Sequence, residues 1–184
     1  MTETELIQGC INKREDYQKL LFDRYSGKMM AVCNRYTNNK HQAQDIFQEA
    51  FIKVFNYIQQ YRFEGSFEGW MRRVFISVAM REISKQKKML FSDIEPERME
   101  EQGVDPEIIS KMSEAEIHAL VRSLPDGYRT VFNLNVIEGY SHEEIAVMLK
   151  IKASTSRVQL VKAKRYLQAL MLKKNKKIGY EQYL

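Results

Sequence analysis

Long apolar runs are missing from this 184-residue sequence. None approaches the roughly 18 residues that a membrane-spanning helix needs. The opening stretch, MTETELIQGCINKRED, is acidic and polar, whereas a secretory signal peptide begins basic and continues apolar. We therefore expect no membrane insertion and a cytoplasmic location.

Cysteine and histidine are also scarce. Cys10 and Cys33 lie in unrelated contexts, and the three histidines have no ligand-like spacing, which favours buried thiols over a metal site or a disulfide. The sequence has no cluster of carboxylates, no nucleophile beside a base and no glycine-rich phosphate loop. These absences argue against an enzyme, so we expect no catalytic residues, no bound metal and no cofactor.

Helix breakers are few, with three prolines and eight glycines, while 44% of the residues are hydrophobic. Leu, Met, Lys, Glu and Gln, which favour helices, are frequent. The length suits one full domain or two small ones. The composition therefore predicts an all-α protein, and we expect two small helical modules.

Charge is distributed unevenly along the chain. Residues 1–88 carry a net charge of +5, residues 89–119 carry −7, and residues 120–184 carry +7. Two basic blocks around an acidic segment indicate two surfaces that contact a polyanion, joined by a segment that avoids or imitates it. Ordinary surface charge is the alternative interpretation.

Helical periodicity is clear in the first basic block. Between Glu5 and Val32 it predicts one packed helix whose buried stripe is Leu20, Leu21, Tyr25, Met29 and Val32. After a turn at Asn38 and Asn39, a second helix has a core face made of Ala43, Ile46, Phe47, Ala50, Phe51, Val54, Phe55 and Ile58.

The opposite face of this second helix carries an apolar residue where solvent predicts a polar one. Ile52 lies there among Asp45, Gln48, Glu49 and Asn56. An isoleucine ringed by polar residues is typical of a docking patch. A stray isoleucine on an ordinary amphipathic helix remains the alternative.

The segment YRFEGSFEG, residues 61–69, breaks the helical period and places aromatic residues on a predicted loop. A new helix follows from about Trp70, with Met80 assigned to its basic side. Rings stack on bases while cations follow phosphates, so this region predicts single-stranded nucleic acid binding, although Trp70 and Phe75 could simply be core. The candidate contacts are Tyr61, Phe63, Ser66, Phe67, Trp70, Arg73, Ser77, Arg81, Lys85 and Lys88.

Two helices separated by a short turn are predicted near the C-terminus. Asp126 is expected to cap an earlier helix, and Ser141 with Glu144 fits a capping box. After a break at residues 150–153, a new helix is expected to start at Ser154 or Thr155. This spacing is typical of a helix-turn-helix.

The last helix has an apolar stripe of Leu160, Ala163, Leu167 and Leu170. Its opposite side is polar, basic and small apolar, a mixture that suits the DNA major groove; a solvated charged face is the alternative. The candidate duplex contacts are Ser154, Thr155, Arg157, Val158, Val161, Lys162 and Arg165.

Three motifs in this order resemble the extracytoplasmic-function (ECF) subfamily of sigma-70 RNA polymerase sigma factors. They are Asp45-Ile-Phe-Gln48-Glu49-Ala-Phe51, the stretch Phe67 to Lys88 around Trp70-Met-Arg-Arg, and Leu124-Pro125 through Gly139-Tyr140-Ser141 to Ala163-Lys164. The resemblance covers about Leu20 to Leu170. Departures include Ser77, where the family usually has asparagine, and Ser154, Val158 and Gln159 for its usual glycine, serine and arginine.

The resemblance implies a sigma region 2 domain in residues 1–90, an acidic linker in 91–112 and a sigma region 4 domain in 113–184. It implies that Asp45, Gln48, Glu49 and Ile52 bind core RNA polymerase. The loop Phe63 to Gly69 would capture a base flipped from the minus-ten promoter element, and residues 155–165 would read the minus-thirty-five duplex. An anti-sigma protein is a further implied partner, besides promoter DNA.

Two other functions fit parts of the pattern. A stand-alone helix-turn-helix regulator would bind its duplex site without polymerase, whereas a sigma factor should bind weakly until core enzyme is added. An RNA-binding protein would use the region from Tyr61 to Lys88 and would not need the C-terminal helix pair.

Overall fold

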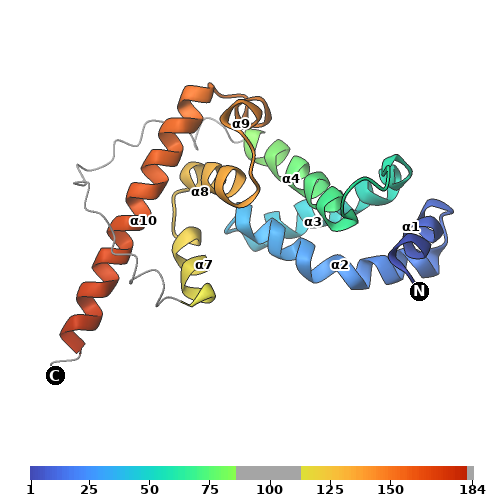
Figure 1. Ribbon diagram of the computed structural model, residues 1–184, viewed down its shortest axis with the longest axis horizontal. Helices are drawn as coiled ribbons and strands as arrows, with labels where there is room; N and C mark the ends of the chain where they lie inside the picture. Colours follow the sequence, from blue (N-terminus) through green and yellow to red (C-terminus); the bar gives the residue numbers. More distant parts are fainter. Residues whose placement is uncertain (86–112, 182–184) are drawn as a thin grey trace. The chain divides into compact units, whose positions relative to one another are not determined.

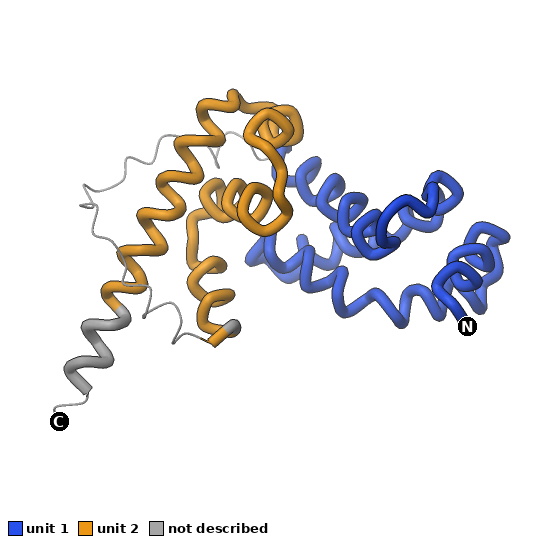
Figure 2. The backbone as a smooth tube through the Cα atoms, viewed as in Figure 1, with its two compact units in different colours: residues 1–85 blue, residues 86–184 orange. Residues whose placement is uncertain are grey.

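The computed structural model describes residues 1–85 and 113–181, and the chain divides into two compact units, residues 1–85 and 86–184 (Figure 2). All regular secondary structure in the described ranges is helical, which confirms the predicted all-α class. None of the described helices is both long and apolar enough to cross a membrane. The predicted acidic linker, 91–112, and Lys88 lie outside the described residues.

The first unit contains four α-helices and a short 3-10 turn at Ile58–Gln60 (Figure 1). The α-helices are α1 (Glu3–Ile11), α2 (Glu15–Tyr36), α3 (Lys40–Tyr57) and α4 (Phe67–Lys85).

The predicted single helix from Glu5 to Val32 is wrong, because α1 and α2 are separate. Lys13 has a φ of 56° between them, a left-handed conformation that cannot continue an α-helix. Leu20 is also corrected: it is 45% exposed, while the other four members of the predicted stripe are buried.

The core of this unit contains a cluster of aromatic side chains between α3 and α4. Phe75 of α4 contacts Phe47 and Phe51 of α3, with ring centroids 6.0 and 5.2 Å apart, both near edge-to-face. The predicted core face of α3 is therefore confirmed, apart from Phe55, which is half-buried. Asn39 accepts hydrogen bonds from the backbone N–H groups of His41 and Gln42 and so caps α3 at the predicted turn.

α4 begins at Phe67, three residues before the predicted start, and it packs against both α2 and α3. A helix with two packing partners buries a wider face than one with a single partner. Met80 is consequently 2% exposed, which corrects its assignment to the basic side.

The second unit contains the remaining described helices. They are α7 (Glu114–Arg122), α8 (Asp126–Phe132) continued by a π-helical turn (Asn133–Ile137), α9 (His142–Leu149) and α10 (Ala153–Glu181). Its core joins Leu124 and Tyr128 to Ala163 and Leu167, so α10 is anchored on the start of α8. The predicted capping box is confirmed: Ser141 Oγ accepts from the N–H of Glu144, and the Glu144 carboxylate accepts from the N–H of Ser141. Hydrogen bonds from the backbone N–H and the hydroxyl of Ser141 lower the pKa of the Glu144 carboxyl.

A buried arginine fastens the entrance of α8. The Arg129 side chain is 1% exposed; its Nη1 donates to the carbonyls of Arg122 and Leu124, at 3.2 and 3.3 Å, and its Nη2 lies 2.5 Å from Asp126 Oδ1. Asp126 is thus the first residue of α8 and a partner of Arg129, not the predicted cap, because Pro125 occupies the cap position.

We expect Arg129→Ala to destabilise the second unit by about 2–4 kcal/mol, because it leaves a cavity and two carbonyls without their donor. Urea unfolding followed by circular dichroism should show the loss. The tryptophan fluorescence transition should not move, because Trp70 is the only tryptophan and lies in the first unit. Arg129→Lys keeps the charge but loses the planar fork of the guanidinium. Its loss of stability should therefore be smaller than that of Arg129→Ala. Unchanged dichroism curves would contradict this role for Arg129.

Candidate functional site

The predicted docking patch lies on the solvent side of α3. Ile52 is 60% exposed, Asp45 and Gln48 are exposed, and Glu49 is half-buried. The opposite, core-facing side of α3 packs against α2 and α4, so Ile52 points away from these contacts. The structure therefore confirms the exposed isoleucine and its polar surroundings.

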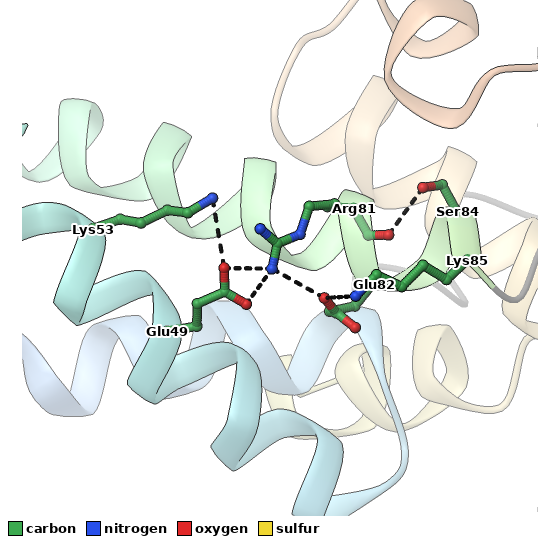
Figure 3. A network of polar contacts seen from close by, with 6 residues as sticks. All are labelled: Glu49, Lys53, Arg81, Glu82, Ser84 and Lys85. Carbon is green, nitrogen blue, oxygen red and sulfur yellow. Dashed lines mark hydrogen bonds and ion pairs between the residues drawn. The ribbon is translucent and has the colours of Figure 1, made fainter.

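Glu49 also belongs to a charge network that joins α3 to α4 (Figure 3). Its carboxylate pairs with the guanidinium of Arg81 and, at 3.6 Å, with Lys53 Nζ. Arg81 lies 3.2 Å from Glu82, which pairs with Lys85 at 2.8 Å. The hydrogen bonds from Lys85 and Arg81 lower the pKa of the Glu82 carboxyl. One residue of the predicted docking patch thus holds one residue of the predicted strand-binding face.

Four residues on the exposed side of α4 form a row that is inclined to the helix axis. Arg73, Ser77, Arg81 and Lys85 are exposed and follow one another at intervals of four residues, which places them along one side of the helix. A strand laid along this row would meet three cationic groups and one hydroxyl. The predicted separation of a basic side from a buried side is confirmed for these four residues.

The loop between α3 and α4 differs from its prediction. Phe67 is fully buried in the first turn of α4 and Tyr61 is 7% exposed, whereas Phe63 is 47% exposed. The Tyr61 ring packs between Phe63 and Phe67, at centroid distances of 5.0 and 5.1 Å, and its hydroxyl donates to the carbonyl of Gly65 at 2.8 Å. Tyr61 and Phe67 therefore build the loop, and a base could stack on Phe63 without displacing the core.

Phe63 is also conformationally unusual, because its φ of 58° is left-handed. That region is unfavourable for a bulky residue and is found mostly where surrounding contacts impose it. Here the contact with Tyr61 supports the exposed ring.

Ser66 and Trp70 hold the other end of the same loop. Ser66 Oγ accepts from the N–H of Gly69 at 3.1 Å, so this hydroxyl, a predicted DNA contact, caps α4. The Trp70 ring is half-buried and stacks on Phe67, with centroids 5.5 Å apart and planes 20° from parallel. Trp70 is thus partly core, as the alternative interpretation of the sequence allowed.

α10 presents the predicted two sides, although it begins at Ala153, before the expected Ser154 or Thr155. Leu160, Ala163 and Leu167 are buried, and Leu170 is half-buried. On the other side Val158 and Val161 are 50% and 47% exposed. Exposure of these apolar side chains to water is unfavourable, whereas contact with thymine methyl groups would be favourable. Among the remaining candidates, the exposed residues are Ser154, Arg157 and Arg165, and the half-buried residues are Thr155 and Lys162.

Two polar contacts fix α9 against the start of α10, and the sequence analysis missed both. His142 Nδ1 lies 2.8 Å from Ser156 Oγ, and Arg157 Nη2 lies 2.5 Å from Glu143 Oε1. Ser156 is fully buried. The turn between the helices contains Lys150 at a φ of 54°, which ends α9.

The cysteines offer no reactive thiolate. Burial raises the pKa of Cys10 to about 11 and that of Cys33 to about 12, so both are neutral thiols at physiological pH. Within residues 1–85 and 113–181 no three His, Cys, Asp or Glu side chains come together in a way that could hold a metal ion.

Comparison with known protein families accounts for both units. The sigma-70 region 2 family matches residues 21–89, and the sigma-70 region 4 family matches residues 114–167. The region 2 match begins within α2 and runs through α4, including the predicted docking patch, and the region 4 match includes the helix-turn-helix. Together with the relatives described next, these matches show that the chain belongs to the ECF subfamily of the sigma-70 RNA polymerase sigma factors.

Similar curated proteins come from distant bacteria. The ECF RNA polymerase sigma factor SigW of Bacillus subtilis is 30% identical over 159 residues, covering 80% of this chain and 85% of SigW. The RNA polymerase sigma-H factor of Pseudomonas aeruginosa is 28% identical over 179 residues, covering 89% and 93%. The ECF RNA polymerase sigma factor SigE of Mycolicibacterium smegmatis is 29% identical over 157 residues, but the match spans only 61% of that protein and 83% of this chain.

Two solved structures are similar at 15% sequence identity. One is CnrH in complex with the cytosolic domain of CnrY, with a TM-score of 0.47, covering 90% of this chain and 94% of that chain. The other is the sigma factor RpoE in complex with the anti-sigma factor NepR from Bartonella quintana, with a TM-score of 0.48, covering 84% and 96%.

Proposed function

We propose that this chain is a non-catalytic promoter-reading subunit that acts in the cytoplasm on core RNA polymerase and promoter DNA. The exposed Ile52 on α3 is the observation that carries the proposal, because an apolar side chain ringed by polar residues suits docking on a protein partner. In this proposal Asp45, Gln48 and Glu49 surround Ile52 and bind the polymerase through polar contacts. An anti-sigma protein that covers these surfaces in the uninduced cell is a further proposed partner.

The first unit would open DNA with binding energy alone. Stacking a base on an aromatic ring is worth roughly 1–3 kcal/mol, and extruding a base costs a few kcal/mol. With Tyr61 and Phe67 buried, Phe63, which is 47% exposed, provides one accessible ring in this loop. The remaining free energy for strand opening must come from phosphate contacts. The row Arg73, Ser77, Arg81 and Lys85 supports such contacts.

The second unit would read the duplex upstream. The core contacts of Leu160, Ala163 and Leu167 fix α10 so that its opposite side faces outward. Val158 and Val161 would then meet base methyl groups, while Arg157 and Arg165 reach base edges or phosphates. Docking of the first unit to polymerase and reading by the second would select the promoter together.

Run-off transcription from genomic fragments, with purified core enzyme and this chain, tests the proposal. We expect discrete transcripts and weak DNA binding by the chain alone. Binding of a duplex site by the chain alone, with no transcript from any fragment, would instead identify a stand-alone regulator.

Ile52→Asp should abolish association with core polymerase, because it places a charge in the apolar centre of the contact. Co-elution with core enzyme in gel filtration measures association, and circular dichroism should show an intact fold. Ile52→Leu, which keeps the apolar character, should still associate. Normal co-elution of Ile52→Asp would place the docking face elsewhere.

Phe63→Ala should slow promoter opening, with a loss of roughly 1–3 kcal/mol from the missing stack. Opening can be followed by the fluorescence of 2-aminopurine placed in the minus-ten segment of a promoter found by run-off transcription. Tyr57→Ala is the matched control, since Tyr57 is similarly exposed, at 48%, but lies on α3 outside the loop. Equal opening rates for Phe63→Ala and the unchanged protein would exclude Phe63 as the stacking platform.

A further inference from the structure

The contacts between α9 and α10 keep strict register. Consecutive residues of α9, His142 and Glu143, contact consecutive residues of α10, Ser156 and Arg157. The first contact ends on a fully buried hydroxyl, so it fixes the start of α9 beside the start of α10. Glu143 is thereby held next to Arg157 by the backbone of its own helix.

Arg157 retains most of its hydrogen-bonding capacity in this position. A guanidinium has five N–H donors, and the contact with Glu143 Oε1 runs through Nη2 alone. The Arg157 and Glu143 side chains are 55% and 66% exposed, so the pair is open to a ligand. The terminal fork of Nη1 and Nη2 can therefore still donate two hydrogen bonds outward.

The carboxylate changes which ligand this arginine prefers. A free guanidinium beside DNA is attracted to phosphate, which carries a full negative charge. A carboxylate at 2.5 Å offsets that charge and repels a second anion, whereas it repels the O6 and N7 acceptors of guanine much less, because these carry only partial negative charge. Glu143 therefore weakens the interaction of Arg157 with a base edge less than its interaction with a phosphate.

We infer that Glu143 is a specificity-determining residue of the duplex-reading surface, which positions Arg157 for a base edge and keeps it from phosphate. This inference rests on the proposed function, because it requires α10 to enter the major groove. Glu143 acts through Arg157 and need not touch DNA itself. An exposed ion pair adds little stability. If the pair had only a structural role, its removal would therefore leave the fold and the base preference unchanged.

The test measures base preference and salt dependence in the assembled holoenzyme. The unchanged factor and core polymerase select duplexes from a pool randomised across the upstream promoter segment, and the selected duplexes are sequenced. The same is done with Glu143→Gln, Arg157→Ala and the double variant. Asp23→Asn, which removes an exposed carboxylate from the first unit, controls for net charge.

We expect Glu143→Gln to lower the preference at one base pair by about fivefold or more, the discrimination of a good bidentate contact. Affinity for unrelated duplexes should rise, and the plot of log K against log salt should steepen by about one as Arg157 turns to a phosphate. Arg157→Ala should lose the same preference, and the double variant should match Arg157→Ala. Asp23→Asn should leave the preference unchanged.

Three results would overturn the inference. One is an unchanged base preference in Glu143→Gln, and another is an equal loss of affinity for all sequences. A preference that changes further when Glu143→Gln is added to Arg157→Ala would show that Glu143 contacts a base directly. If the unchanged holoenzyme selects no sequence, the proposed function fails, an outcome distinct from these three.

Discussion

The packing of Phe75 against Phe47 and Phe51 is the contact on which the first unit depends. It joins α4 to α3 through their apolar sides and thereby fixes where their polar sides lie. Ile52 is turned outward on α3, and Arg73, Ser77, Arg81 and Lys85 are turned outward on α4. Glu49 and Arg81 meet where these two sides adjoin (Figure 3). One aromatic core thus positions both surfaces that the proposed function needs, so a mutation there would impair docking and strand binding together.

Periodicity predicted the helices whose apolar residues form a regular stripe in the sequence. The core of α3, the exposed Ile52 and the two sides of α10 follow from residues three and four apart, and the structure confirms them. Periodicity failed where the buried face is wider than one apolar stripe, or where the chain leaves the helix. Met80 is buried because α4 packs against two helices, and Phe67 and Tyr61 are buried because the loop folds back on its own rings. A local pattern contains no information about such additional neighbours.

The missed polar contacts share another cause, which is distance along the chain. Glu49 and Arg81 are 32 residues apart, and Glu143 and Arg157 are 14 apart. A count of charges by segment assigns these arginines to basic blocks and cannot show that each is paired with a carboxylate. Arg129 was missed for a related reason: arginine is rarely fully buried, and only the folded turn before α8 supplies its carbonyl acceptors.

Under the proposed function, the two paired arginines would help a basic protein to read DNA selectively. Arg81 and Arg157 are both exposed and each is held by a carboxylate from the neighbouring helix. Exposed ion pairs are worth about 0–1 kcal/mol, so these two pairs add little to the stability of the fold. The same carboxylates reduce attraction to arbitrary phosphates, which is the main source of nonspecific binding. Pairing would therefore lower the affinity for unrelated DNA more than the affinity for a site that supplies base acceptors. Selectivity is the difference between these two binding free energies, so it would increase.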